Sequence, residues 1–297
     1  MNETAKKKNN KPTLPVWGRI ILIIIAFLFL GGFLQVIGAL IAKIPLMQPS
    51  AFENLSMNQQ LILQLSTFIA LAVIVYLFRK FIDQKSIKSM GFTFRNKVSD
   101  IVAGLIFALI IIGGGTLILY TLGHLDFSNY QFNQETLFRT FLFFLLVSFN
   151  EEILFRGYIL NNLLTTRMNK YLALLVSAIL FALFHAFNAN LSLVGMINLL
   201  LAGILLGSTY IFTQNLWFPI SLHLFWNFFQ GPVFGYSVSG QKIDSIATIE
   251  LTGDNLMNGG NFGFEGSIVC TVMSLISIGL ILYYYNKNQP FPTRGND

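Results

Sequence analysis

The chain has few charged residues, and this scarcity bears on whether it is a soluble protein or a membrane protein. Only 11% of its 297 residues are Asp, Glu, Lys or Arg, while 54% are hydrophobic. A soluble domain carries roughly 25% charged residues. The composition therefore favours a membrane protein over a soluble globular fold, because lipid can cover apolar surface that water would not tolerate.

Cysteine is almost absent as well. Cys270 is the single one, so a disulfide framework within the chain and a cysteine-rich metal cluster are both excluded. The formal net charge of +6 does not indicate nucleic-acid binding, because the basic residues form no patch with interleaved aromatics. They cluster beside apolar runs, as the cytoplasmic flanks of membrane spans do.

Long apolar runs fill much of the chain. A membrane-spanning helix needs about 20 apolar residues and satisfies its backbone polar groups internally. Eight runs are long enough or nearly so: 17–41, 61–78, 101–122, 137–165, 171–188, 191–212, 216–231 and 267–285. The first is longer than the apolar core of a secretory signal peptide and is interpreted as an uncleaved span. The sequence thus predicts an all-α, polytopic membrane protein with about eight transmembrane helices.

The positions of Lys and Arg test this count independently. Basic residues precede the first run and follow the second, fourth and eighth: Lys6, Lys7, Lys8 and Lys11; Arg79, Lys80, Lys85, Lys88, Arg95 and Lys97; Arg167 and Lys170; Lys287 and Arg294. The intervening loops are poor in Lys and Arg. Since cytoplasmic loops are enriched in these residues, the alternation predicts eight crossings with both termini in the cytoplasm.

This topology divides the chain into five parts. They are a basic cytoplasmic tail (1–16), three helices (17–135), a core of four helices (136–231), an extracytoplasmic loop (232–266), and a last helix with its tail (267–297). The loop is rich in Gly, Asn and Ser, and it is interpreted either as an ordered cap or as a flexible connection.

Polar side chains interrupt three runs of the predicted core. They are Glu151, Glu152 and Arg156, then His185 one helical turn after Phe181, and then His223 and Asn227. A charged side chain at the bilayer centre costs about 2.5–3.5 kcal/mol on insertion scales, and such residues are usually functional or paired. Glu152 and Arg156 are four residues apart and can pair on one helix face.

The depths of these groups predict that they meet. Runs 137–165 and 171–188 form an antiparallel hairpin, and Glu151 and His185 lie at similar distances from its turn near Asn169, roughly 20–25 Å along each helix. We therefore predict a shared polar cavity that opens to the cytoplasm. The alternative is a structural role, in buried ion pairs and hydrogen bonds between helices.

The residue types suit the attack of water on a carbonyl group. A carboxylate beside a histidine can take a proton from water, while a second histidine and an amide can donate hydrogen bonds to the oxyanion. Glu151, His185 and His223 are also a common zinc ligand set, although their spacing is not the His-Glu-x-x-His of a zincin helix. Zn²⁺ is thus the one cofactor that the sequence allows, and the residues do not decide whether it is used.

These motifs resemble those of the CPBP family of intramembrane proteases, also called the Abi or type II CAAX prenyl endopeptidase family, which includes a bacteriocin-processing group. The family shows Glu-Glu-x-x-x-Arg, Phe-x-x-x-His and then His-x-x-x-Asn, or a small residue in place of the Asn, in this order. The chain matches all three within about residues 140–230. The resemblance implies that Glu151 activates water with His185, and that His223 and Asn227 form an oxyanion hole. Glu152, Arg156 and Phe181 would support the site, and the mechanism would be either zinc-dependent or metal-free.

The sequence therefore predicts an intramembrane endopeptidase of the cell membrane. Its partners would be the lipid bilayer and a peptide or membrane-protein substrate, with no nucleic acid. The family name implies prenylated substrates, but peptide maturation, peptide or bacteriocin immunity, or processing of a membrane regulator is expected instead. Two alternatives are a proton-coupled transporter, in which the same Glu and His residues relay protons, and a catalytically silent peptide-immunity scaffold.

Overall fold

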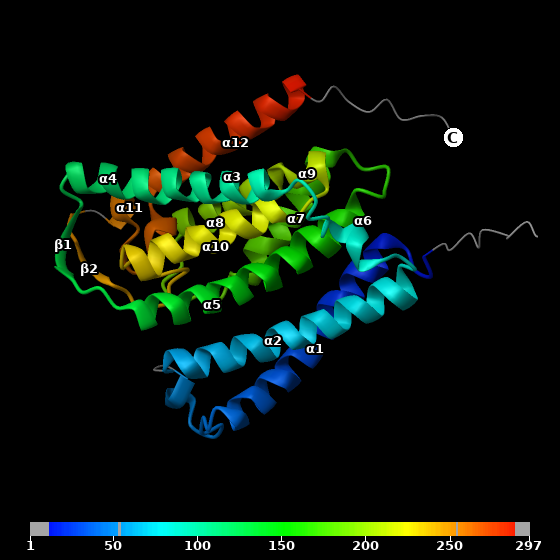
Figure 1. Ribbon diagram of the computed structural model, residues 1–297, viewed down its shortest axis with the longest axis horizontal. Coiled ribbons are helices and arrows are strands. Elements are labelled where there is room, and N and C mark those ends of the chain that lie inside the picture. The colour runs from blue at the N-terminus through cyan, green and yellow to red at the C-terminus, as the bar shows by residue number, and fades with distance from the viewer. Residues whose placement is uncertain (1–11, 53–54, 254, 289–297) are drawn as a thin grey trace, which may run out of the picture.

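The computed structural model describes residues 12–52, 55–253 and 255–288, and it is mostly helical (Figure 1). The longer helices are α1 (Val16–Ile41), α2 (Met57–Leu77), α3 (Val98–Ala108), α4 (Gly114–Thr121), α5 (Gln134–Glu152), α7 (Lys170–Phe184), α8 (Leu193–Ser208), α10 (Trp217–Phe228) and α12 (Ile268–Asn288). The short elements are α6 (Asn161–Leu163), α9 (Tyr210–Thr213), α11 (Asn255–Asn258), β1 (Leu125–Tyr130) and β2 (Ala247–Leu251). The predicted basic residues Lys6, Lys7, Lys8, Lys11 and Arg294 lie outside the described residues.

All eight apolar runs predicted from the sequence are helical. Within the described residues, five helical stretches are long and apolar enough to cross a membrane: Val16–Ile41, Met57–Ile82, Val98–Thr121, Leu193–Thr213 and Ile268–Asn288. The other three runs contain α5, which ends in two glutamates, and the shorter α7 and α10, of 15 and 12 residues. The chain is a multi-pass helical membrane protein with five candidate full-length spans among its described residues, and the count of eight stays a prediction.

Most of the long helices run along the long axis of the molecule (Figure 1). The strands and α11 lie at one end, and α6 and α9 lie at the other. Helix α10 packs against α3, α5 and α8, and α7 packs against α8. The helices that carry the predicted site therefore meet in the interior, whereas α1 and α12 lie at the periphery.

The outer helices present apolar side chains to their surroundings. Phe29 and Phe33 of α1 are 78% and 62% exposed, and Leu280 of α12 is 58% exposed. A soluble monomer rarely exposes contiguous apolar surface on this scale. Lipid is therefore the natural solvent for these faces.

Helices α7 and α8 approach closely through Gly203. A Cβ atom at this position would lie 2.8 Å from the Cα atom of Ala178, so a larger residue would push the two helices apart. The sequence predicts this role for Gly203 and Gly207, because small residues four apart allow membrane helices to approach.

The sequence suggests no intramembrane polar group in the first half of the chain, and this expectation is wrong. Arg19 of α1 and Arg79 at the end of the second span are buried and both bind the buried carboxylate of Asp83, at 2.8 and 3.1 Å. Arg19 also donates to the Asn162 Oδ1 atom, and the Tyr158 hydroxyl donates to Asp83. In the sequence, Arg79 is indistinguishable from the charges of a solvated loop.

The described residues of the loop, 232–253 and 255–266, form a cap with regular structure. Its strand β2 pairs antiparallel with β1, in a register that sets Leu251 opposite Leu125 and Ala247 opposite Tyr130. The all-α prediction omits this sheet, since strands of five or six residues give little periodic signal in a Gly-, Asn- and Ser-rich segment. The pairing fixes the cap to the connection between α4 and α5.

Candidate active site

The glutamate pair lies where the geometry of the fourth run changes. Helix α5 ends at Glu152, and Ile153–Leu160 continue it as a buried π-helix. A π-helical turn closes its hydrogen bonds one residue further along than an α-helical turn, and such turns often occur at functional sites. The change of helical geometry directly follows the two carboxylates.

Glu152 is the buried anchor of the site. Its Oε1 atom accepts hydrogen bonds from Arg156 Nη1 at 2.7 Å and from His223 Nδ1 at 2.9 Å. Arg156 Nη2 donates to the Gly203 carbonyl oxygen at 2.9 Å. The pairing of Glu152 with Arg156 agrees with their four-residue spacing, and the same carboxylate also sets the orientation of the His223 ring.

Phe181 packs between the charged groups of the site. The Arg156 guanidinium lies 4.7 Å from the centre of the Phe181 ring, an arrangement that attracts a cation to an aromatic face. The ring centres of Phe181 and His185 are 4.6 Å apart. Phe181 thereby separates the buried Arg156 from the imidazole of His185.

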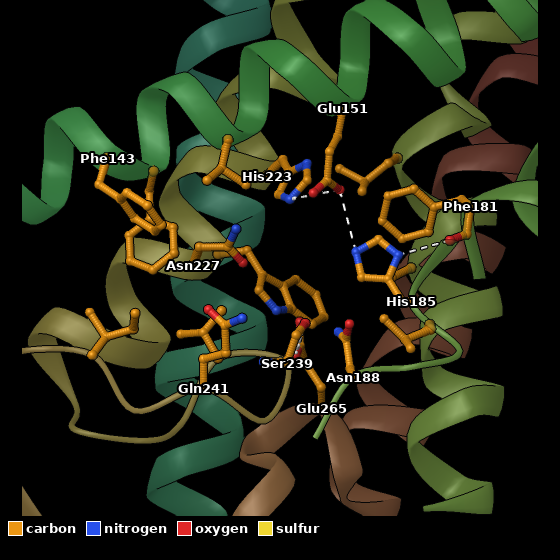
Figure 2. Close-up of a pocket in the computed structure, with 18 of the residues that line it drawn as sticks. Phe143, Glu151, Phe181, His185, Asn188, His223, Asn227, Ser239, Gln241 and Glu265 are labelled. Atoms are coloured by element: carbon orange, nitrogen blue, oxygen red, sulfur yellow. Dashed lines mark hydrogen bonds and ion pairs between the residues drawn. The ribbon is translucent and has the colours of Figure 1, made fainter. Parts of the chain in front are cut away.

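Glu151 faces two imidazoles (Figure 2). Its Oε2 atom is 3.6 Å from His185 Nε2 and 3.9 Å from His223 Nε2. This buried oxygen has no hydrogen-bond partner among the described residues. Two ring nitrogens and one unsatisfied carboxylate oxygen therefore converge on the space that Glu151 lines.

The tautomer of His185 follows from its other contact. The Nδ1 atom lies 2.8 Å from the Phe181 carbonyl oxygen, which can only accept, so Nδ1 carries a proton. In the neutral ring, Nε2 is then a proton acceptor facing Glu151. The sequence places His185 inside a span, but the structure places it directly after the last residue of α7, where the chain turns.

Asn227 lies one turn beyond His223 on α10 and points into the same cavity (Figure 2). It is 5% exposed. Within the described residues its side-chain amide makes no hydrogen bond. The amide is therefore available to a bound molecule.

The predicted residues Glu151, His185, His223 and Asn227 line one cavity of about 240 Å³. One water molecule occupies roughly 30 Å³ in the liquid, so the cavity can hold water together with part of a substrate. Glu152 and Arg156 do not line it and lie behind it. Four of the predicted side chains thus face the cavity, whereas Glu152 and Arg156 lie behind it and support the residues that line it.

Sequence reasoning missed the opposite wall of this cavity. Asn188, Ser239, Gln241 and Glu265 contribute to this wall (Figure 2). Three of them belong to the cap, which is far from the motifs in sequence. Their only sequence signal is a polar residue in a polar loop, and nothing in that pattern indicates a shared cavity.

The cavity extends toward the capped end of the bundle. Its lining includes Val238, Ser239, Gln241, Ile243 and Glu265, whereas the basic segment 79–97 and the turn 164–170 do not line it. The depth argument predicts a cavity that opens to the cytoplasm, and this opening stays a prediction, because the basic segments do not line the cavity. That argument extends α7 to residue 188, whereas the helix ends at Phe184 and the polar groups lie at its far end.

The predicted zinc ligands do not form a metal-binding group as placed. Tetrahedral zinc with bonds of roughly 2.0–2.2 Å sets its ligand atoms about 3.3–3.6 Å apart, so the separation of 3.9 Å between Glu151 and His223 is too long. No set of three or more His, Cys, Asp or Glu among the described residues meets the geometry of a metal site. We therefore derive no chemical step through zinc.

Comparison with known families gives one match. Residues 133–229 match the model of the type II CAAX prenyl endopeptidase Rce1-like family, which confirms the resemblance noted from the three motifs. The match covers α5, α7, α8 and α10, and it supports protease activity. A comparison with curated proteins finds no match to the chain.

Proposed function

We propose that the protein is an intramembrane endopeptidase in which Glu151 and His185 activate water. The observation that carries this proposal is the Glu151 Oε2 atom, which is buried, lacks a hydrogen-bond donor among the described residues, and faces two imidazole Nε2 atoms. A water molecule in the cavity supplies the missing donor. Its oxygen is then held next to two proton acceptors.

The first step is the attack of this water on the substrate carbonyl carbon. His185 Nε2 or the Glu151 carboxylate takes one water proton while the new C–O bond forms and the carbonyl π electrons move to oxygen. General-base catalysis of this kind typically contributes about 10²–10⁴ in rate. The Phe181 carbonyl oxygen keeps the His185 Nδ1–H in place and leaves Nε2 free for the proton.

The second requirement is stabilisation of the oxyanion. Asn227 Nδ2 has no partner among the described residues to compete with a substrate, and His223 lies one turn away on the same helix. Because His223 Nδ1 is bound to Glu152, the imidazolium form donates from Nε2. One such donor is typically worth about 10²–10³ in rate.

Collapse of the tetrahedral intermediate completes the reaction. The C–N bond breaks, and the proton held by His185 or Glu151 passes to the leaving nitrogen. The products are a carboxylic acid and an amine, and the acid then passes its proton to the amine or to solvent to become a carboxylate. Glu152 and Arg156 contribute by position alone, since they hold His223 and pack against Phe181 without lining the cavity.

The same proposal includes the membrane topology. Eight spans with both termini in the cytoplasm would result if α5, α7 and α10 complete the bundle of five full-length spans, with residues 136–231 as the catalytic core and the cell membrane as the location. The Lys- and Arg-rich segments 79–97 and 164–170 would then be cytoplasmic. The cavity would open at the extracytoplasmic end, where peptides outside the cell are a better substrate class than cytoplasmic prenylated proteins.

The test is peptide cleavage by purified protein in lipid vesicles. Wild type, Glu151→Gln and the exposed control variant Glu250→Gln are each given a peptide library, and products are identified by mass spectrometry. Cleavage by wild type and the control, with at least a 10³-fold loss in Glu151→Gln, supports the proposal. Absence of cleavage by wild type, or equal cleavage by all three proteins, contradicts it and favours the transporter or the silent scaffold.

A second experiment, with a metal chelator, tests whether cleavage depends on a bound metal ion. Metal content is measured, and cleavage is assayed before and after removal of bound metal. The proposed mechanism predicts an unchanged rate in metal-free protein. Loss of activity that zinc alone restores would assign Glu151, His185 and His223 as ligands and overturn the metal-free mechanism.

A further inference from the structure

Glu265 is a carboxylate that the proposed chemistry does not use. It lies in the short turn Phe264–Gly266 of the cap, just before α12, and is 7% exposed. It lines the same cavity as Glu151 and lies across that cavity from the two histidines (Figure 2). The cavity thus has a catalytic wall and, facing it, a wall with a second acidic group.

The position of Glu265 is fixed by contacts on both sides. Its Oε2 atom accepts from the backbone N–H and from the hydroxyl of Ser239, both at 2.8 Å. Its backbone carbonyl accepts from Asn198 Nδ2 of α8 at 2.7 Å. Ser239 has a left-handed φ of 48°, which few residue types other than glycine adopt, and in that conformation its two donors meet one carboxylate oxygen.

No cation neutralises this carboxylate in the part of the chain that the structure describes. Glu265 takes part in none of the ion pairs between described residues, and neither Lys nor Arg lines the cavity. Its neighbours on the wall, Asn188, Ser239 and Gln241, are uncharged. Burying an unpaired charge is costly, and Oε2 alone is used by protein donors, so Oε1 is left to a bound group.

We infer that Glu265 is a specificity site for a cationic group of the substrate, a Lys or Arg side chain or a free N-terminal ammonium, held close to the scissile bond. This inference rests on the proposed protease function. A carboxylate in a partly desolvated wall binds a cation far more strongly than it does in water. Bound substrate would supply the counter-charge that the described residues do not.

The test compares matched peptides with wild type and Glu265→Gln. The substrate is the best peptide from the library, prepared with Lys, acetyl-lysine or norleucine next to the cleaved bond, and with a free or an acetylated N-terminus. Wild type is expected to cleave the peptide with the recognised cation at least about tenfold faster in kcat/KM than its neutral counterparts, the effect of one charged hydrogen bond. Glu265→Gln keeps an acceptor for Ser239 and is expected to abolish this preference while cleaving neutral peptides at the wild-type rate.

The position of the required charge identifies its source. Loss of the preference on acetylating the Lys side chain assigns a side-chain cation, and loss on acetylating the N-terminus assigns an ammonium. The control is Glu250→Gln, which removes an exposed acidic residue of the same cap outside the cavity and should leave the preference intact. Equal rates for charged and neutral peptides with wild type, or a Glu265→Gln variant slowed equally on both, would overturn the inference.

A binding measurement separates this inference from the proposed function. The dissociation constants of a fluorescent Lys-containing peptide and its acetyl-lysine counterpart are compared in Glu151→Gln with and without Glu265→Gln. At least tenfold tighter binding of the charged peptide that depends on Glu265 supports the subsite even if no peptide is cleaved. Equal affinity in both backgrounds rejects it even if the protein proves to be a protease.

Discussion

Replacement of Asn227 by alanine tests the oxyanion assignment at a single hydrogen bond. The Asn227 amide lines the cavity, is 5% exposed, and has no hydrogen-bond partner among the described residues. Truncation therefore enlarges an existing cavity without leaving a protein group unpaired. The free energy of unfolding should change little, whereas the oxyanion loses a donor.

Loss of one preorganised donor costs about 10²–10³ in kcat, or roughly 2.7–4 kcal/mol of transition-state stabilisation. Because the bond forms only as charge develops, kcat and kcat/KM should fall by the same factor while KM stays nearly constant. The assay is steady-state cleavage of a fluorogenic peptide in vesicles, with thermal unfolding measured on the same preparations.

The exposed Asn129 of β1 offers a matched control, since Asn129→Ala removes the same amide far from the cavity. A loss of less than tenfold in kcat for Asn227→Ala would refute the assignment. A raised KM with unchanged kcat would instead place Asn227 against the ground-state substrate. A flux driven by a pH gradient that survives the substitution would favour the transporter.

Three further predictions follow from the buried contacts and the cap. Glu152→Ala leaves the Arg156 charge buried without its partner, and unfolding in detergent should show a loss of about 3–5 kcal/mol. Asp83→Asn removes the only carboxylate between two buried arginines among the described residues and should destabilise by a similar amount, while the folded fraction keeps its kcat because the cavity is elsewhere. Gln241→Cys places a thiol on the exposed rim of the cavity, and a membrane-impermeant reagent should label this thiol in intact cells. Wild type should stay unlabelled, because its single cysteine, Cys270, is buried. Labelling only after the membrane is opened would reverse the proposed topology.

The sequence predicts the helices well because hydrophobic length is a local property. It also predicts the Glu152–Arg156 pair and the joint presentation of His223 and Asn227, since residues four apart share a helix face. The end of α7 is harder to predict. The apolar run continues beyond Phe184, and only the turn that follows shows that His185 lies outside the helix.

The parts that could not be predicted depend on contacts between residues far apart in the sequence. Glu265 reaches the cavity because the cap folds back over the bundle and because Asn198 of α8 holds its carbonyl. Neither contact produces a periodic pattern in the sequence from which it could be predicted. Arg79 and Asp83 look like ordinary loop charges in the sequence, and only the fold places Arg19 beside Asp83, 64 residues earlier in the chain.

The buried position of Arg19 also orders events during synthesis. Its two oxygen partners, Asp83 and Asn162, follow it by 64 and 143 residues. At a synthesis rate of roughly 5–20 residues per second, Asn162 is made about 7–30 s after Arg19. Helix α1 enters the bilayer with a cation whose native partners do not yet exist, and its final packing waits for the middle of the chain. An insertion chaperone that shields α1 during this interval would therefore act before α7 and α10, which carry the candidate site, have been made.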